Sequence, residues 1–478
     1  MLNFIENQLS SFKSCFSRSA AYRWFVVVIV GLLARTDFLG VTSIIRCLAI
    51  SPSRYESLLH FFRSDAFSIQ DLRQTWLRLV SKSGTLFTFN SRTLLLGDGT
   101  KHPKEGRYMP GVKKLFQESG DSSKPSYLFG HMFGGIAAVL HRGGCFFALP
   151  LTMSIQDGLS ETAAWSKSCA SRALSHIIQM VRNGYGAAAS LGLSYLVLDR
   201  YFLSVPALEE LDRLNQHCHL LDTITRAKSS CTAYELPENT ARRRGRPRKK
   251  GTPVKLNTLF QDRASDFTRA QVLMYGKRET VEYLCLDLLW GKKLYKKLRF
   301  VLVKSRKGNC IFVSTGLTLE PAGIIEAYAH RFKIECTFRE FKQHIGGFCY
   351  HFWTKAMPKI KKYGKKEEAS GLSDVEDCRR RNRILKTVEA TERFVLCASI
   401  AMGITQMMAL TPSIAETVRK HRYLRTASGH KVSEATVLEY LRKNIFRLLY
   451  LNRHSEISQL ILSLQVPESS AGGEQMPA

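Results

Sequence analysis

The stretch TLLLGDGT, residues 93–100, is a short apolar run that ends in an acid followed by glycine. The stretch YLVLDR, residues 195–200, repeats this design later in the chain. Continuous apolar runs of this length predict strands buried on both faces. An aspartate at the carboxyl end of such a strand lies where open α/β folds place their chemistry. We therefore expect an α/β fold with Asp98 and Asp199 as candidate catalytic residues.

Both aspartates also have a purely structural interpretation. Asp98 could begin a glycine-rich turn, and Asp199 could cap the helix that follows it. A third acid, Glu335, favours the functional interpretation, because three oxygen ligands of this kind suit magnesium or manganese rather than a soft metal.

Glu335 belongs to the stretch YAHRFKIECTFREFK, residues 328–342, which we predict to be one helix. Helical spacing places a phenol, one acid and three cations on one stripe: Tyr328, Arg331, Glu335, Arg339 and Lys342. The opposite face is apolar and should be buried: Ala327, Ile334, Phe338, Phe341 and Ile345. A carboxylate can hold a divalent metal, while arginine, lysine and tyrosine bind phosphate oxygens. The alternative is an ordinary solvent-exposed face.

The pattern Tyr-x2-Arg-x3-Glu-x6-Lys in this stretch resembles the YREK signature of the IS4-type DDE transposases of bacterial insertion sequences. The resemblance covers roughly residues 90–350. It implies an RNase H-like catalytic core in which Asp98 lies on the first strand, Asp199 on the fourth and Glu335 on a late helix. These three residues would be the catalytic triad and the metal ligands.

The resemblance also implies an activity, namely cut-and-paste DNA transposition of an insertion sequence by strand cleavage and strand transfer at terminal inverted repeats. Two Mg²⁺ ions per active site, for which Mn²⁺ could substitute, would be the cofactors. The partners would be the double-stranded DNA of the transposon ends and target, and a second subunit in a homodimeric synaptic complex. The protein would act in the bacterial cytoplasm, associated with the nucleoid, without a membrane. The expected phosphate contacts are Tyr328, Arg331, Arg339 and Lys342, and Lys101, His102 and Lys104 would add contacts near Asp98.

Composition agrees with a nucleic-acid partner. Lysine and arginine number 70 against 40 acids, which gives a formal net charge of +30. A hydrophobic content of 45% argues against a disordered basic protein. The 12 cysteines form no CxxC pair, so neither a zinc ribbon nor a disulfide framework is expected, and a reducing cytoplasm fits.

We expect four parts along the chain: a helical DNA-binding domain at 1–85, the catalytic domain at 86–355, a helical region at 374–465 and a disordered tail at 466–478. Within the catalytic domain we predict strands at 126–133 and 143–155, a crossover helix at 160–187, and a β-rich insertion at 229–297. Helices are also expected at about 379–408 and 433–451.

Two segments of the N-terminal domain allow more than one interpretation. Residues 40–63 could form a helix-turn-helix that reads DNA, or a helical pair that only packs. The apolar run at 24–34, preceded by basic residues, imitates a signal peptide, but it is too short to span a bilayer and no small-x-small cleavage site follows. A buried helix is the better interpretation.

The predicted insertion opens with the basic run ARRRGRPRKKG, residues 241–251. Its core, Gly245-Arg246-Pro247, resembles an AT-hook, which lays arginines such as Arg244 and Arg246 in the minor groove of A·T-rich DNA. The alternative is a flexible charged loop. Trp290, further along the insertion, could stack on a displaced base or belong to the core.

Two rivals to transposition remain open. A nuclease or resolvase on the same fold would cut DNA without joining it, and a DNA-binding protein with decayed catalysis would do neither. A tyrosine recombinase is disfavoured, because its HxxR element occurs only at His60–Arg63 and no tyrosine lies in a fitting later motif.

Overall fold

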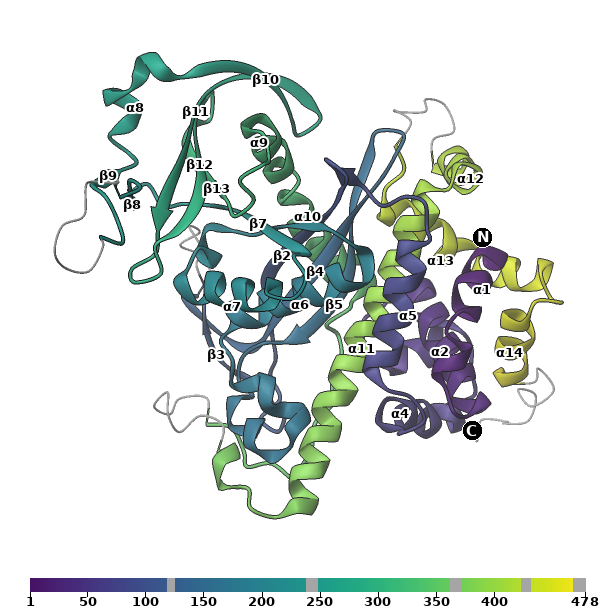
Figure 1. Ribbon diagram of the computed structural model, residues 1–478. Helices are drawn as coiled ribbons and strands as arrows, with labels where there is room; N and C mark the ends of the chain where they lie inside the picture. The colour runs from purple at the N-terminus through teal and green to yellow at the C-terminus, as the bar shows by residue number, and fades with distance from the viewer. Residues whose placement is uncertain (118–124, 238–247, 362–370, 423–430, 467–478) are drawn as a thin grey trace.

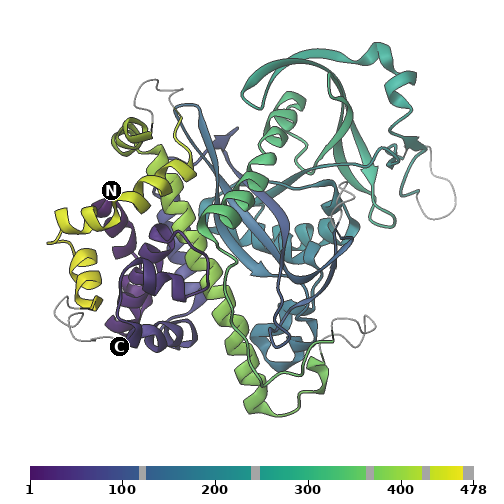
Figure 2. The same cartoon turned by 180° about the vertical axis from the view of Figure 1, so that it is seen from behind.

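The chain has a mixed α/β fold built on one large sheet. The computed structural model describes residues 1–117, 125–237, 248–361, 371–422 and 431–466. Figures 1 and 2 show the sheet in the middle, a helical lobe on one side and a β-rich lobe on the other.

The strands and helices have the following bounds. The strands are β1 (Thr88–Phe89), β2 (Arg92–Pro103), β3 (Lys113–Phe116), β4 (Tyr127–Arg142), β5 (Cys145–Ile155), β6 (Ser194–Val197), β7 (Leu221–Arg226), β8 (Thr232–Tyr234), β9 (Pro253–Lys255), β10 (Thr268–Met274), β11 (Lys277–Trp290), β12 (Lys296–Ser305) and β13 (Gly308–Ser314). The α-helices are α1 (Leu2–Ser10), α2 (Ser19–Ala34), α3 (Thr42–Cys47), α4 (Tyr55–Arg63), α5 (Ile69–Ser81), α6 (His176–Leu191), α7 (Val205–Asn215), α8 (Leu259–Asp262), α9 (Pro321–Ala329), α10 (Phe332–Glu340), α11 (Cys378–Leu410), α12 (Pro412–Arg422), α13 (Glu434–Leu451) and α14 (Glu456–Leu464). Short turns are η1 (Lys13–Cys15), η2 (Pro52–Arg54), η3 (Ser160–Trp165), η4 (Lys167–Ala173), η5 (Arg200–Phe202), η6 (Ala264–Asp266), the π-helical η7 (Phe341–Ile345) and η9 (Leu372–Asp374).

The central strands follow the order β5-β4-β2-β6-β7. β4 is antiparallel to both β2 and β5, whereas β2, β6 and β7 are parallel to one another. The strands predicted at 126–133 and 143–155 are β4 and β5, but β4 continues to Arg142. The reason is a tight hairpin at Gly143 and Gly144, whose φ angles of 57° and 74° suit glycine and let both strands run to the turn.

The crossover from β5 to β6 differs from the single helix predicted at 160–187. Residues 160–173 form the turns η3 and η4, and the helix α6 starts only at His176. Its start is fixed by Ser175, whose hydroxyl accepts a hydrogen bond from the Ile178 N–H at 3.4 Å. α6 packs on β6 closely, because a Cβ on Gly184 would lie 2.5 Å from Leu196 Cδ2.

The helical lobe surrounds α11, which runs along β5 and also contacts α2, α4, α5 and α13 (Figure 1). α2 contains the apolar run at 24–34 and is buried, as expected for a core helix. α11 is long and apolar enough to cross a membrane, but its apolar window is wholly buried inside the fold, which is typical of the core helix of a globular protein. The lobe and the sheet share one hydrophobic core.

The β-rich lobe continues the central sheet. β13 pairs antiparallel with β7, and β12, β11 and β10 follow outward. Long strands therefore begin only at residue 268 and continue to 314, beyond the end of the insertion predicted at 229–297. The described residues of that insertion before 268 hold only the three-residue strands β8 and β9 and two short helical turns. Trp290 is half-buried and packs against the smaller core of this lobe.

Candidate functional site

The two candidate aspartates lie at the same edge of the parallel part of the sheet. Leu96 on β2 is paired with Val197 on β6. Asp98 comes two residues after Leu96, and Asp199 comes two residues after Val197, so the two aspartates leave the paired strands at the same level. The expectation that Asp98 ends its strand is wrong, because β2 continues to Pro103 in antiparallel pairing with β4. Only the parallel pairing with β6 stops before Asp98, so the aspartate still lies where the parallel strands diverge.

The neighbours of Asp98 explain why small residues surround it. A Cβ on Gly97 would lie 2.6 Å from Leu198 Cδ2, and one on Gly99 would lie 2.4 Å from Met132 Cε. The Gly99 N–H donates to Asp98 Oδ1 at 2.7 Å. Asp199 precedes the turn η5 but makes no capping hydrogen bond to it, which argues against the simple capping interpretation.

Glu335 lies on α10, but the single helix predicted at 328–342 is wrong. α9 ends at Ala329, α10 begins at Phe332, and the last turn is the π-helix η7. At the junction, the N–H groups of His330, Arg331, Lys333 and Ile334 bond three residues back rather than four. The His330 ring, 4.8 Å from that of Phe146, packs the tightened turn onto β5.

The break divides the predicted stripe. Tyr328 is only 8% exposed, and its ring lies 4.8 Å from that of Phe312. Arg339 points outward and pairs with Glu340 at 2.9 Å. Arg331, Glu335 and Lys342 remain on the side that faces β2, because Arg331 contacts Asp98 and Lys342 contacts Lys101. The predicted apolar face is confirmed, since its members are buried: Ala327, Ile334, Phe338, Phe341 and Ile345.

Arg331 joins two of the candidate catalytic acids. Its Nη1 donates to Asp98 Oδ2 at 3.1 Å, and its Nη2 donates to Glu335 Oε1. The Arg331 side chain is 16% exposed. Although burial disfavours its charge, the carboxylates of Asp98 and Glu335 raise the pKa of Arg331. A strand and a helix far apart in the sequence are thus held together by one cation.

The electrostatics of Asp98 reflect its position inside the fold. Burial raises the pKa of Asp98 to about 6, and the nearby charges of Glu335 and Asp199 act in the same direction. Arg331 and the Gly99 N–H act against them and favour the ionised form. The Asp98 carboxylate is therefore a buried, ionisable group surrounded by like charges and one counter-ion, which is typical of functional sites.

The lysines near Asp98 have different surroundings. The Lys342 ammonium donates to the backbone oxygen of Lys101 at 3.0 Å, and the Lys101 ammonium donates to that of Phe116. The expectation that Lys104 contacts phosphate is wrong. Lys104 is 7% exposed, and its ammonium donates to the backbone oxygens of Phe348 and Tyr350. It therefore holds the loop after η7. Burial lowers the pKa of His102 to about 3, so this ring is neutral.

Sequence reasoning missed two side chains beside the acids. His176, at the start of α6, lies so close to Gly99 that a Cβ there would be 3.1 Å from its Nε2. Burial lowers the pKa of His176 to about 4. Tyr201 is 58% exposed, and its ring lies 6.3 Å from that of His176. Tyr201 could have been found because it follows Asp199 by two residues, whereas only the tertiary structure brings His176 to this edge.

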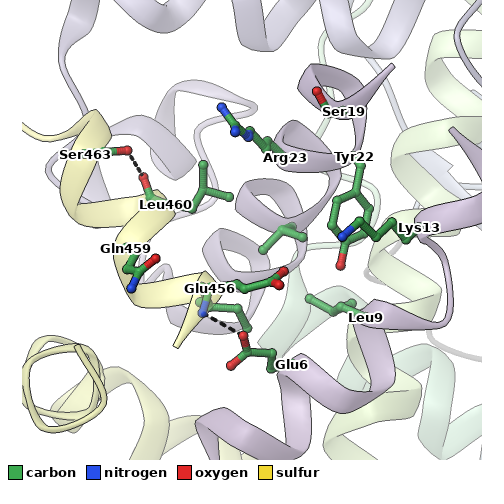
Figure 3. Close-up of a pocket in the computed structure, with 12 residues that line it drawn as sticks. Glu6, Leu9, Lys13, Ser19, Tyr22, Arg23, Glu456, Gln459, Leu460 and Ser463 are labelled. Atoms are coloured by element: carbon green, nitrogen blue, oxygen red, sulfur yellow. Dashed lines mark hydrogen bonds between the residues drawn. The ribbon is translucent and has the colours of Figure 1, made fainter. Parts of the chain in front are cut away.

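Other candidate sites have less support. Arg244 and Arg246 of the AT-hook-like run lie outside the described residues, as does nearly all of the predicted tail. A cavity of about 400 Å³ between α1, α2 and α14 is lined by Glu6, Tyr22, Arg23 and Glu456 among others (Figure 3), but none of the candidate catalytic residues reaches it. In the part of the chain that the structure describes, no three His, Cys, Asp or Glu side chains are already grouped as a metal site. Arg331 stands between two of the acids instead.

A comparison with known proteins identifies the family. The family model for the DDE superfamily endonucleases matches residues 11–280, which is more than half of the chain and includes Asp98 and Asp199. Among curated proteins, no sequence matches the chain. An endonuclease family implies DNA as the substrate, phosphoryl transfer as the reaction and a divalent metal as the general cofactor. On the strength of this match, the chain belongs to the DDE superfamily endonuclease family.

Proposed function

We propose that the protein is an IS4-type transposase that cuts and joins DNA at the terminal inverted repeats of an insertion sequence. The observation that carries this proposal is the meeting of Asp98, Glu335 and Arg331 at the sheet edge where Asp199 also lies. The order of the five central strands supports an RNase H-like assignment. In chain order, Asp98 lies on the first of them, β2, and Asp199 lies just after the fourth, β6.

The donor set fits a hard divalent cation. Asp98, Asp199 and Glu335 offer carboxylate oxygens only, and the counter-ion Arg331 already sits between two of them. With all three acids ionised, the formal charge of the four side chains is −2, which a divalent cation would balance. We assign these three carboxylates as the ligands of two such ions per active site, Mg²⁺ or Mn²⁺. One ion would activate the attacking oxygen and the other would stabilise the leaving oxygen.

The cationic side chains have separate roles in this proposal. Arg331 and Lys342, which both face β2, would hold phosphates of the DNA end. Lys101 and the outward-facing Arg339 would contact the backbone further from the acids. Tyr328 is assigned to the same clamp and, because it is nearly buried, would act by packing beside Arg331. Arg244 and Arg246 would add minor-groove contacts, as the resemblance of their segment to an AT-hook implies.

The triad can be tested by conservative substitutions. Asp98→Asn, Asp199→Asn and Glu335→Gln each remove one charged ligand, so we expect DNA cleavage to fall by several orders of magnitude. DNA affinity should change little, because it depends on many cations. The assay is Mg²⁺-dependent cleavage of a plasmid that carries the element and its flanking DNA, with gel-shift binding of the same DNA measured in parallel. A variant that still cuts at the wild-type rate would exclude that residue as a ligand.

The products of the same reaction separate transposition from its two rivals. Excision together with joined products supports strand transfer, which by resemblance would pass through a hairpin at the transposon end in a homodimeric complex. Cleavage without joining would indicate a nuclease or resolvase. Binding without cleavage would indicate a DNA-binding protein. The protein would carry out transposition in the bacterial cytoplasm, on the DNA of the nucleoid.

A further inference from the structure

The Arg331 guanidinium occupies the position between Asp98 and Glu335 that a shared cation would take. One of its terminal nitrogens faces each carboxylate, and all three side chains are at least partly buried. Arg331 pairs with Glu335, four residues later in the sequence, as helical spacing allows. Its contact with Asp98 on β2 depends instead on the tertiary packing of α10 against β2.

A guanidinium and a divalent metal compete for the same oxygens. Both are attracted to carboxylates, but arginine keeps its charge at every accessible pH, so it cannot yield its place by losing a proton. A metal that bridges Asp98 and Glu335 must therefore displace Arg331 from at least one of them. The free energy of breaking that ion pair is subtracted from the free energy of metal binding.

We propose that Arg331 is the internal counter-ion of the metal-free site and that it competes directly with the metal for Asp98 and Glu335. In the free protein it keeps the two acids together without an ion, at the cost of a weaker metal affinity. A phosphate group that engages the same guanidinium releases the carboxylates. Arg331 is thus a positioning residue that links phosphate binding to metal loading. This inference rests on the proposed function, because it takes the acids as metal ligands.

The test measures Mn²⁺ affinity rather than activity. Free Mn²⁺ is followed by electron paramagnetic resonance while it is titrated into DNA-free protein at pH 8, where Asp98 is ionised. We expect Arg331→Gln to bind Mn²⁺ between about 5-fold and 150-fold more tightly than the wild type, the usual range for coupled sites. Equal affinity of the two proteins would overturn the inference.

Two further variants make the result specific. Arg299 forms a comparable, partly buried ion pair with Asp287 at 2.8 Å in the β-rich lobe, so Arg299→Gln is a matched control that should leave Mn²⁺ affinity unchanged. The double variant Asp98→Asn with Arg331→Gln should lose the tight binding. Binding that depends on Asp98 but not on Arg331 would overturn only the inference. If no protein binds Mn²⁺, or if the Asp98→Asn substitution leaves Mn²⁺ affinity unchanged, the proposed metal site itself would be overturned.

Discussion

Among single residues, Asp98 is the one to which we assign a catalytic role although its surroundings disfavour its charged form. Its pKa is raised to about 6, chiefly because the carboxylate is buried. In the unfolded chain the group ionises near its ordinary value of about 3.9. Folding therefore binds a proton to Asp98 between these two pH values, and the folded state loses stability as the pH rises through about 6. A destabilising residue kept at a site is consistent with a functional role.

This environment predicts the stability of the Asp98→Asn variant in metal-free buffer. The amide that replaces the carboxyl cannot ionise, so the variant should be more stable than the wild type at pH 8, by about 1–3 kcal/mol. The difference should shrink as the pH falls from 6 to 4, because the carboxyl of the folded wild type then binds a proton and no longer holds a charge inside the fold. Thermal unfolding in EDTA at pH 4.5 and 8 measures it, with the exposed Asp262→Asn as control. A gain that is equal at both pH values would show that ionisation is not its cause.

At the element scale, the segment from α9 to η7 is shaped by contacts at both of its breaks. The tightened turn at His330 and the widened π-helix change the direction of successive side chains, and π-helical turns are frequent at functional sites. Arg35, at the end of α2, donates to the backbone oxygens of Ile345 and Gly346, each at 2.8 Å. Arg442 from α13 donates to that of His344. Two arginines from distant helices thus bind the backbone oxygens at the end of the segment from α9 to η7 and cap it.

This cap predicts the behaviour of Arg35→Met. The substitution keeps an unbranched side chain but leaves buried carbonyl groups without donors, so we expect a loss of roughly 2–4 kcal/mol in the free energy of unfolding. Hydrogen exchange should increase most at residues 341–347. Arg35→Lys should restore part of the loss, and it serves if the methionine variant does not fold. The exposed Arg46→Met is the control. Faster exchange spread evenly over the chain would contradict a local capping role.

In the molecule as a whole, the helical lobe and the central sheet depend on each other for stability. Trp76 of α5 is fully buried, and its Nε1 donates to the backbone oxygen of Pro150 on β5 at 2.9 Å. A Cβ on Gly403 of α11 would lie 2.3 Å from the Trp76 ring, so this glycine makes room for it. One side chain therefore ties the N-terminal helices to both the sheet and the central helix.

This junction predicts cooperative unfolding. Trp76→Ala should cost about 3–5 kcal/mol, because it leaves a large cavity in the shared core. The variant should still unfold in one transition, with hydrogen exchange in α2 and in β2 accelerated together. Urea unfolding followed by circular dichroism gives the loss, and Trp353→Ala, at a side chain that is 52% exposed, is the control. Two separate transitions would show that the lobe and the sheet are independent units.

The features that depend on local pattern could be predicted from the amino-acid sequence. The apolar runs before Asp98 and Asp199 predicted buried strands, and the spacing of Ile334, Phe338 and Phe341 predicted a buried helical face. These predictions succeed because side-chain periodicity and strand hydrophobicity are fixed by neighbouring residues. The family match agrees with the class of enzyme that the motif suggested, whereas the individual catalytic roles stay predictions.

Which charged side chains contact one another became clear only from the three-dimensional fold. Helical periodicity predicted Arg331 as a phosphate contact, and nearness to Asp98 in the sequence predicted Lys104. In the structure Arg331 binds Asp98, and Lys104 is buried against the loop at Phe348 and Tyr350. The helix breaks at His330 and Phe341 could not be predicted from the sequence either, because the ring packing and the arginine caps come from elements distant in the sequence. Long-range packing determines whether a charged side chain is buried and which groups it contacts. The reason is that the free energy of a buried charge depends on partners that no local pattern specifies.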